Sequence, residues 1–291
     1  EFVTADGRIM RSGSRARKSS SGYDLTKLIV GSEGTLGIIT ELTLKLHGRT
    51  ESMSAAICAF PTIDAAVQTV IATIQAGVPI ARMEFIDAET ASILNSYSKE
   101  SLEKFPHLFM EFHGSEASVK EQAELVKEIA SDFQATSFKW SHLEEDRNKI
   151  WKMRHNVLYA YKAYYSGSTL IATDVCVPIS KLAQIVNETQ IDIQNSGISG
   201  PIIGHVGDGN FHSTLMIRDQ NTEDLKIANE LSHRMNERAL KLGGTVSGEH
   251  GVGIGKKKYM EKEHGDAWQL MSSIKTALDP NCILNPGKMI R

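Results

Sequence analysis

Cysteine is scarce in this sequence and is not clustered. The 291 residues contain three, Cys58, Cys176 and Cys282. No two of them stand at the short spacing of a disulfide framework or a thiolate zinc site. We therefore expect three reduced cysteines in the core of the fold.

An excess of positive charge and a long apolar run are also missing. The 32 basic residues face 35 acidic ones, for a net charge of -3. This balance provides no field that attracts polyanions, so we predict no nucleic-acid partner. No apolar run approaches the roughly 20 residues of a membrane-spanning helix, and we expect no membrane span. The sequence starts at Glu1 without an initiator Met or a leader, so we expect it to be part of a longer chain.

The composition is otherwise that of a folded protein. Hydrophobic residues make up 41% and charged residues 23% of the sequence, which is enough apolar material for a sizeable core. At roughly 150 residues per domain, the length predicts two domains. No internal repeat is visible in the sequence.

The first 50 residues are expected to form a small sheet. Glu1 to Val3 begins as a strand, and Leu28 to Val30 is a short apolar run between Gly- and Ser-rich loops, which indicates a buried strand. From Leu42 to Leu46 leucines alternate with polar residues, the period-two pattern of a half-buried strand.

From residue 52 onward, strands alternate with amphipathic helices, which predicts an α+β fold with a largely antiparallel, helix-covered sheet. Strands are expected at 52–60, 81–86, 107–113, 136–140, 168–177, 201–206 and 210–217. Helices are expected at about 63–76, 88–96, 116–132, 143–163, 179–195, 222–242 and 266–277.

The segment 204–212, GHVGDGNFH, carries the strongest chemical signal. The Asp-Gly at 208–209 predicts a two-residue hairpin turn, which would place His205 directly opposite His212. Opposed side chains lie about 5 Å apart on one face, so two imidazoles can converge on one metal ion, with Asn210 on the same face. The alternative is a glycine-rich turn with two surface histidines.

The segment 245–255, TVSGEHGVGIG, places an acid beside an imidazole between glycines. A catalytic metal commonly keeps three protein ligands and one open position, and Glu249 is the natural oxygen donor to join His205 and His212. His250 would then serve as a general base. The spacing fits no zinc-finger or HExxH pattern, and the alternative is a loop before a basic helix start.

Arg154 falls on the apolar stripe of the helix expected at 143–163. A guanidinium on a buried face needs an anion, preferably a carboxylate bound by two parallel hydrogen bonds. That anion is either a substrate or an internal Asp or Glu. A third possibility is that Arg154 extends past the core to water.

The loop Gly31 to Gly37, GSEGTLG, lies between two expected strands. Its backbone N–H groups suit a phosphate or the edge of a flavin. A glycine-rich connection without a ligand is the alternative.

Four motifs together resemble the FAD-linked oxidase family of the vanillyl-alcohol oxidase type. They are KSSSGYDLTKLIVGSEGTLGIITELTLKL (18–46), GHVGDGNFH (204–212), SGEHGVGIGKKKYM (247–260) and LDPNCILNPGKM (278–289). Within the family, TDVCVPIS (173–180) and RHN (154–156) point to enzymes that oxidise D-2-hydroxy acids.

The resemblance implies a domain organisation. Residues 1–50 would be the C-terminal part of an FAD-binding domain, and residues 51–265 a ferredoxin-like cap domain that binds substrate. Residues 266–291 would return to the flavin. The half that wraps the FAD pyrophosphate would precede Glu1, so this chain resembles the C-terminal portion of such an enzyme.

The resemblance also implies site residues. The FAD contacts would be Gly31, Ser32, Gly34, Thr35, Gly37 and Asn285. A divalent metal, which the residues do not resolve among Zn, Mn and Fe, would be bound by His205, His212 and Glu249. Arg154 and Asn210 would bind the substrate.

The implied activity is FAD- and metal-dependent oxidation of a D-2-hydroxy acid, D-lactate to pyruvate, by an enzyme whose catalytic residues are His250 and Arg154. Cytochrome c or a similar carrier would accept the electrons, and the resemblance implies a mitochondrial location. Oxidation of D-2-hydroxyglutarate or glycolate by the same family is one alternative. Another is an inactive metal-binding module that lacks the pyrophosphate half.

One feature bears on the choice of acid. The guanidinium group of Arg154 can bind one carboxylate. The strand Thr169 to Val177 contains no Lys or Arg that could bind a second carboxylate. A dicarboxylate would bury an unpaired charge, at a cost of several kcal/mol. We therefore expect D-lactate and other short or apolar D-2-hydroxy acids to be preferred over D-2-hydroxyglutarate.

Overall fold

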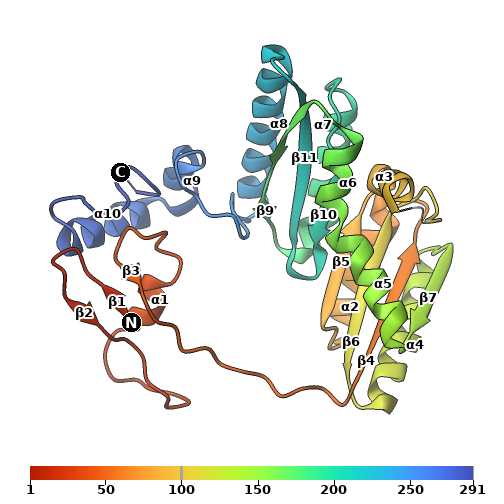
Figure 1. The fold of residues 1–291 in the computed structure, drawn as a ribbon, viewed down its shortest axis with the longest axis horizontal. Helices are drawn as coiled ribbons and strands as arrows, with labels where there is room; N and C mark the ends of the chain where they lie inside the picture. The colour runs from red at the N-terminus through yellow and green to blue at the C-terminus, as the bar shows by residue number, and fades with distance from the viewer. Residues whose placement is uncertain (99–100, 291) are drawn as a thin grey trace. The chain divides into compact units, whose positions relative to one another are not determined.

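The structure, a computed structural model, describes residues 1–98 and 101–290. The chain folds into two compact units, which are described separately (Figure 1). Unit 1 combines Glu1–Gly48 with Val246–Arg291, and unit 2 is Arg49–Thr245. The second break therefore lies at 245/246, whereas the returning segment was expected to start at 266.

Unit 2 is built on an eight-stranded sheet, in the order β7-β4-β6-β5-β10-β11-β8, with β9 also paired to β11. Every described pairing in it is antiparallel. The strands are β4 (Ser52–Ala59), β5 (Arg82–Ile86), β6 (His107–Gly114), β7 (Ser137–Ser141), β8 (Ser168–Ala172), β9 (Val175–Cys176), β10 (Ile202–His205) and β11 (Asn210–Arg218). The prediction of an α+β fold on a largely antiparallel sheet is confirmed.

Helices lie on both faces of this sheet, and α5 and α6 cross one of them in Figure 1. The helices are α2 (Ile63–Gln75), α3 (Ala88–Ser98), α4 (Glu116–Asp132), α5 (Glu144–His155), α6 (Val157–Tyr164), α7 (Leu182–Gln194) and α8 (Thr222–Lys241). Two single turns of 3₁₀ helix occur at Ile179–Lys181 and Val206–Asp208. No helix among the described residues combines the length and the apolar character that crossing a bilayer requires.

The sheet joins two halves of similar topology. The run β4-α2-β5-α3-β6-α4-β7 has the strand order 7-4-6-5, which is the ferredoxin-like arrangement with α3 added between β5 and β6. The run β8-α7-β10-β11-α8 follows the same path, and a single bridge between Cys176 and Thr245 stands where its fourth strand would pair. The sequence shows no internal repeat, because similar topology requires similar hydrophobic periods and not similar residues.

Each face of the sheet has its own core. Below α2, α4, α7 and α8, one continuous apolar cluster takes Met83 and Phe85 from β5 and Phe211 from β11. Below α3, α5 and α6, a smaller cluster takes Ile86 from β5 and Met216 from β11. Alternation along each strand directs neighbouring residues to opposite cores.

Two predicted elements of unit 2 are interrupted. The helix expected at 143–163 ends at His155 and restarts at Val157, with Asn156 as the cap of both segments. The strand expected at 168–177 breaks at Thr173 and Asp174, which are buried. Thr173 binds the backbone of Ser213 through its hydroxyl, and Asp174 accepts a hydrogen bond from an amide side chain. These side-chain bonds add to the backbone hydrogen bond from the N–H group of Thr173 to the carbonyl oxygen of Ser213.

Unit 1 has little regular structure. Its three-stranded sheet has the order β2-β1-β3, from β1 (Phe2–Val3), β2 (Ile9–Met10) and β3 (Ile38–Ile39). Its helices are α1 (Leu25–Ile29), α9 (Met260–His264) and α10 (Asp266–Leu278), with a 3₁₀ turn at Lys257–Tyr259. The small core contains Phe2, Ile29 and Leu36.

Two strands predicted for unit 1 are wrong, and so is the prediction that all three cysteines of the chain are in the core. The strand expected at Leu28 to Val30 falls largely within α1, whose start is stabilised by Asp24 accepting a hydrogen bond from the backbone N–H of Lys27. Leu42 to Leu46 is not a strand, and its leucines are exposed, because no described strand pairs with it. Only one of the three cysteines is fully buried, since Cys282 is exposed and Cys176 is intermediate.

Candidate functional site

The β10–β11 hairpin carries both histidines of the strongest motif, in a register that differs from the prediction. His205 pairs with Asn210, and His212 pairs with Ile203. The expected direct opposition of the two histidines is therefore wrong by two residues. A shift of two preserves the face on which each side chain lies, so both imidazoles and Asn210 still share one face, with ring centroids 5.7 Å apart.

The longer connection explains the shift. Val206–Asp208 forms a turn of 3₁₀ helix, and Gly209 follows in the left-handed region at φ 79°. A Cβ at Gly209 would overlap the carbonyl oxygen of Val177. The Asp-Gly pair thus ends a four-residue connection and is not itself a two-residue turn.

Both imidazoles are held through Nδ1. Nδ1 of His205 donates to Oε1 of Glu84 at 2.7 Å, and Nδ1 of His212 donates to the carbonyl oxygen of Thr173 at 2.9 Å. A neutral imidazole that donates through Nδ1 carries its lone pair on Nε2. This is the arrangement that metal-binding histidines adopt, with the second nitrogen fixed by a carboxylate or carbonyl.

Arg154 lies beside the same pair. It comes from α5, and its Nη2 group donates to Oε2 of Glu84 at 2.9 Å. The side chains of Arg154 and Glu84 are only 12% and 9% exposed. An internal carboxylate is therefore one anion that Arg154 binds. Its Nε atom is buried and has no acceptor among the described residues, so a donor remains for a further anion.

Asn210 is buried and its amide group is used internally. Nδ2 donates to Oδ1 of Asp174 and to the carbonyl oxygen of Val175, both at 2.8 Å. The two N–H bonds are thereby occupied, which leaves the carbonyl oxygen of the amide as the group suited to a ligand.

Three buried acidic residues were not predicted as part of the site: Glu84, Asp174 and Asp87. Each is an acid within or directly after an apolar strand, and all three are buried; that unusual placement was the available signal. Asp87 accepts hydrogen bonds from the backbone N–H groups of Thr90 and Ile202. Burial nevertheless raises the pKa of Asp87 to about 6, because loss of hydration outweighs these bonds.

In unit 1, the GSEGTLG loop lies against the second glycine-rich segment. Glu33 accepts hydrogen bonds from the backbone N–H groups of Val252 and Gly253, at 2.6 and 2.8 Å. The side-chain amide of Asn285 donates to the carbonyl oxygen of Glu33. Three segments far apart in the sequence therefore meet at one acidic residue.

The residues expected to contact FAD differ in how far their backbone is available to a ligand. The backbone N–H groups of Ser32 and Thr35 donate within the chain, to Ile29 and Ser32. Gly37 packs on Phe2, whose ring a Cβ would approach to 2.9 Å. At Gly31, no described atom lies within 4 Å of the place of a Cβ, so the backbone is open to close approach by a ligand.

Glu249 and His250 both belong to unit 1. Their side chains are half-exposed, with His250 Nε2 3.5 Å from Glu249 Oε1. The roles of Glu249 as a metal ligand and of His250 as a base remain predictions.

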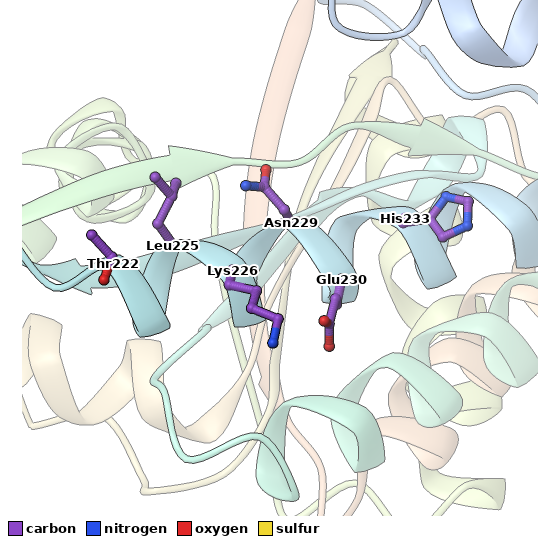
Figure 2. Close-up of a pocket in the computed structure, with 6 residues that line it drawn as sticks. All are labelled: Thr222, Leu225, Lys226, Asn229, Glu230 and His233. Atoms are coloured by element: carbon purple, nitrogen blue, oxygen red, sulfur yellow. The ribbon is translucent and has the colours of Figure 1, made fainter.

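A shallow hollow of about 400 Å³ lies over one side of α8. Figure 2 shows its lining, which is Thr222, Leu225, Lys226, Asn229, Glu230 and His233. None of these residues belongs to the histidine, arginine and asparagine set above, so the hollow is not part of the candidate site.

Comparison with known proteins adds independent information. The family described as "FAD linked oxidases, C-terminal domain" matches residues 49–289. The chain is 45% identical to a Danio rerio protein named "Probable D-lactate dehydrogenase, mitochondrial", over 100% of this chain and 59% of that protein. It is 42% identical to the Arabidopsis thaliana protein "D-lactate dehydrogenase (cytochrome), mitochondrial", over 100% of this chain and 51% of that protein.

The fold has a counterpart among solved structures. A 4-ethylphenol oxidase from Gulosibacter chungangensis matches with a TM-score of 0.73 at 18% identity, over 100% of this chain and 65% of that one. At this identity the likeness concerns the fold alone. The chain spans 51% to 59% of the two named relatives in sequence.

Proposed function

Since the chain belongs to the FAD-linked oxidase family through the C-terminal domain of that family, we propose that the protein oxidises a D-2-hydroxy acid, D-lactate first among them, to the 2-oxo acid. The observation that carries the proposal is the buried set on one sheet face in unit 2. There, Glu84 connects His205 to Arg154, and the second imidazole, that of His212, is held through Nδ1 by the carbonyl oxygen of Thr173.

The polar set fits a divalent metal. Both histidines have Nδ1 occupied by an acceptor, and neutral imidazole Nε2 is a common ligand of Zn, Mn and Fe. In the proposal, His205 and His212 bind the ion together with Glu249. A bound metal ion would supply the positive charge that lowers the pKa of a substrate hydroxyl.

The remaining roles follow from the chemistry of each side chain. Arg154 binds the substrate carboxylate, using donor groups beyond the one that Glu84 accepts. Asn210 orients the substrate through its amide oxygen, and His250 removes the hydroxyl proton.

In unit 1, the open backbone at Gly31 is suited to the flavin edge, as is Asn285, which binds the carbonyl oxygen of Glu33 in the same loop. The other flavin contacts proposed are Ser32, Gly34, Thr35 and Gly37. The flavin supplies the hydride-accepting chemistry when bound. Residues 1–50 and 266–291 are proposed to belong to the flavin-binding part. The substrate-binding part was expected to be 51–265, but residues 246–265 fold with unit 1, so it is proposed to end at 245.

The strand next to β11 supports a small or apolar substrate. In the β8–β11 register, Ala172 is opposite Thr214 and Leu170 is opposite Met216. Thr214 and Met216 follow Asn210 and His212 at even spacing, so these side chains share the face of the site. The two β8 residues opposite Thr214 and Met216 are thus apolar, and neither can pair with a second carboxylate.

The electron acceptor and the location are also proposals. Cytochrome c or a similar carrier would reoxidise the flavin, and a mitochondrial location agrees with the names of the Danio rerio and Arabidopsis thaliana relatives.

The test is anaerobic mixing of the full-length, flavin-containing protein with D-lactate, D-2-hydroxyglutarate or glycolate. We expect D-lactate to bleach the oxidised flavin absorbance and to yield pyruvate. Elemental analysis of protein never exposed to chelator should find about one equivalent of Zn, Mn or Fe per chain, the content of a single-ion catalytic site. Bleaching by none of the three acids, or less than about a tenth of an equivalent of metal, would refute the proposal.

A further inference from the structure

Glu84 has both carboxylate oxygens engaged by residues of the candidate site. Oε1 accepts from Nδ1 of His205 at 2.7 Å, and Oε2 accepts from Nη2 of Arg154 at 2.9 Å. The side chain is 9% exposed. One buried carboxylate therefore contacts the residue proposed to bind the metal and the residue proposed to bind the substrate.

The sheet register fixes this position. β5 pairs with β10 so that Ile86 is opposite Ile203 and Phe85 is opposite Gly204. Continuing that register by one residue places Glu84 opposite His205, within direct cross-strand reach. Arg154 reaches Glu84 from α5, which covers this face. The contact thus joins three elements, β5, β10 and α5.

We propose that Glu84 is a positioning residue that holds His205 for the metal and Arg154 for the substrate carboxylate, so that it influences the affinity for both. The inference rests on the proposed function, because it assigns Glu84 to the same site. It differs from a purely structural reading, in which Glu84 only neutralises the buried Arg154.

The two interpretations predict different effects of Glu84 on the metal affinity of His205. A carboxylate that accepts from Nδ1 fixes the tautomer and orientation of the ring and makes Nε2 a stronger electron-pair donor, and loss of such a group commonly costs 10–100-fold in metal affinity. A carboxylate that served only to neutralise Arg154 would leave the metal affinity unchanged when both residues are removed together.

The experiment uses the full-length holoenzyme and Glu84→Gln, Arg154→Met and the double variant. Zn²⁺ and Mn²⁺ affinities are measured separately by competition with a chromophoric chelator, and steady-state kinetics are measured with D-lactate. We expect Glu84→Gln to weaken metal binding about 10–100-fold and to raise KM more than it lowers kcat. Arg154→Met should raise KM while metal affinity stays within about threefold, because Glu84 still holds His205.

The double variant covers the case in which Glu84→Gln does not fold because Arg154 is left as a buried, unpaired charge. It removes both charges, and its metal affinity is compared with that of Arg154→Met. A drop of about 10–100-fold between these two supports the direct action of Glu84 on His205. Equal metal affinities would overturn it.

Glu111→Gln is the matched control. Glu111 on β6 contacts Nε2 of His113 at 2.8 Å in the same sheet. The substitution therefore removes a carboxylate–imidazole pair that lies outside the site. Its metal affinity and KM should equal those of the unaltered protein. If the unaltered protein itself binds neither ion, the proposed function fails; if it binds one and the Glu84 variants bind equally well, only the inference about Glu84 fails.

Discussion

The two faces of the sheet in unit 2 use the same strands for different purposes. On the face below α2, α4, α7 and α8, β5 contributes Met83 and Phe85 to a continuous apolar cluster. On the opposite face, Glu84 from the same strand binds an arginine and a histidine. Because strand residues alternate between faces, one five-residue strand serves both the main core and the candidate site. One face of the sheet thus contributes mainly to stability and the other carries the candidate site. Substitutions on the first face should change stability, and substitutions in the site should change activity.

The largest effect is expected on the apolar face. Phe112 on β6 is fully buried in that cluster, and Phe112→Ala should lower the free energy of unfolding by about 3–5 kcal/mol, the usual range for a buried phenylalanine. Urea denaturation measures this loss. The folded variant should retain its metal and its KM for D-lactate; a loss of metal without a loss of stability would contradict the division between the faces.

A substitution at the proposed base should show the opposite behaviour. His250 is half-exposed, so His250→Asn should leave the midpoint of urea unfolding nearly unchanged. Turnover should fall about a hundredfold or more, the scale for losing a positioned general base, with the loss in kcat. Flavin and metal content are measured in parallel. Near-normal turnover in the loaded variant would remove His250 from the mechanism.

The smallest effect is expected in the choice of substrate. The site face of β8 carries Leu170 and Ala172, and one arginine is available to bind a substrate carboxylate. The kcat/KM for D-lactate should therefore exceed that for D-2-hydroxyglutarate by about tenfold or more, which corresponds to about 1.4 kcal/mol. Competition between the two acids for the full-length enzyme measures the ratio. A higher value for D-2-hydroxyglutarate would mean that a basic residue elsewhere reaches the second carboxylate.

Much of unit 2 could be predicted from the sequence because its elements have clear periods. The helix over 116–132 matches α4, and the strand expected at 107–113 falls within β6. Unit 1 was harder, since Leu28 to Val30 is too short for its period to distinguish a strand from a helix. Alternation at Leu42 to Leu46 predicted a strand, but pairing requires a neighbour, which no local pattern specifies.

The site was predicted in part. The shared face of His205, His212 and Asn210 followed from alternation and survived the error in register. Glu84 was missed because its contacts join β5 to residues 70 and 121 positions away in sequence. A buried acid within an apolar strand signals that a partner exists, but only the tertiary fold identifies that partner.

The Glu84–His205 pair lies at the junction between the two halves of unit 2. β5 and β10 are the second strands of the two halves, and their antiparallel pairing joins the halves. Across this junction, one half supplies the carboxylate of Glu84 and the other half supplies the imidazole of His205. The acid and the base of the pair therefore come from different halves, and their contact exists only where the two halves meet.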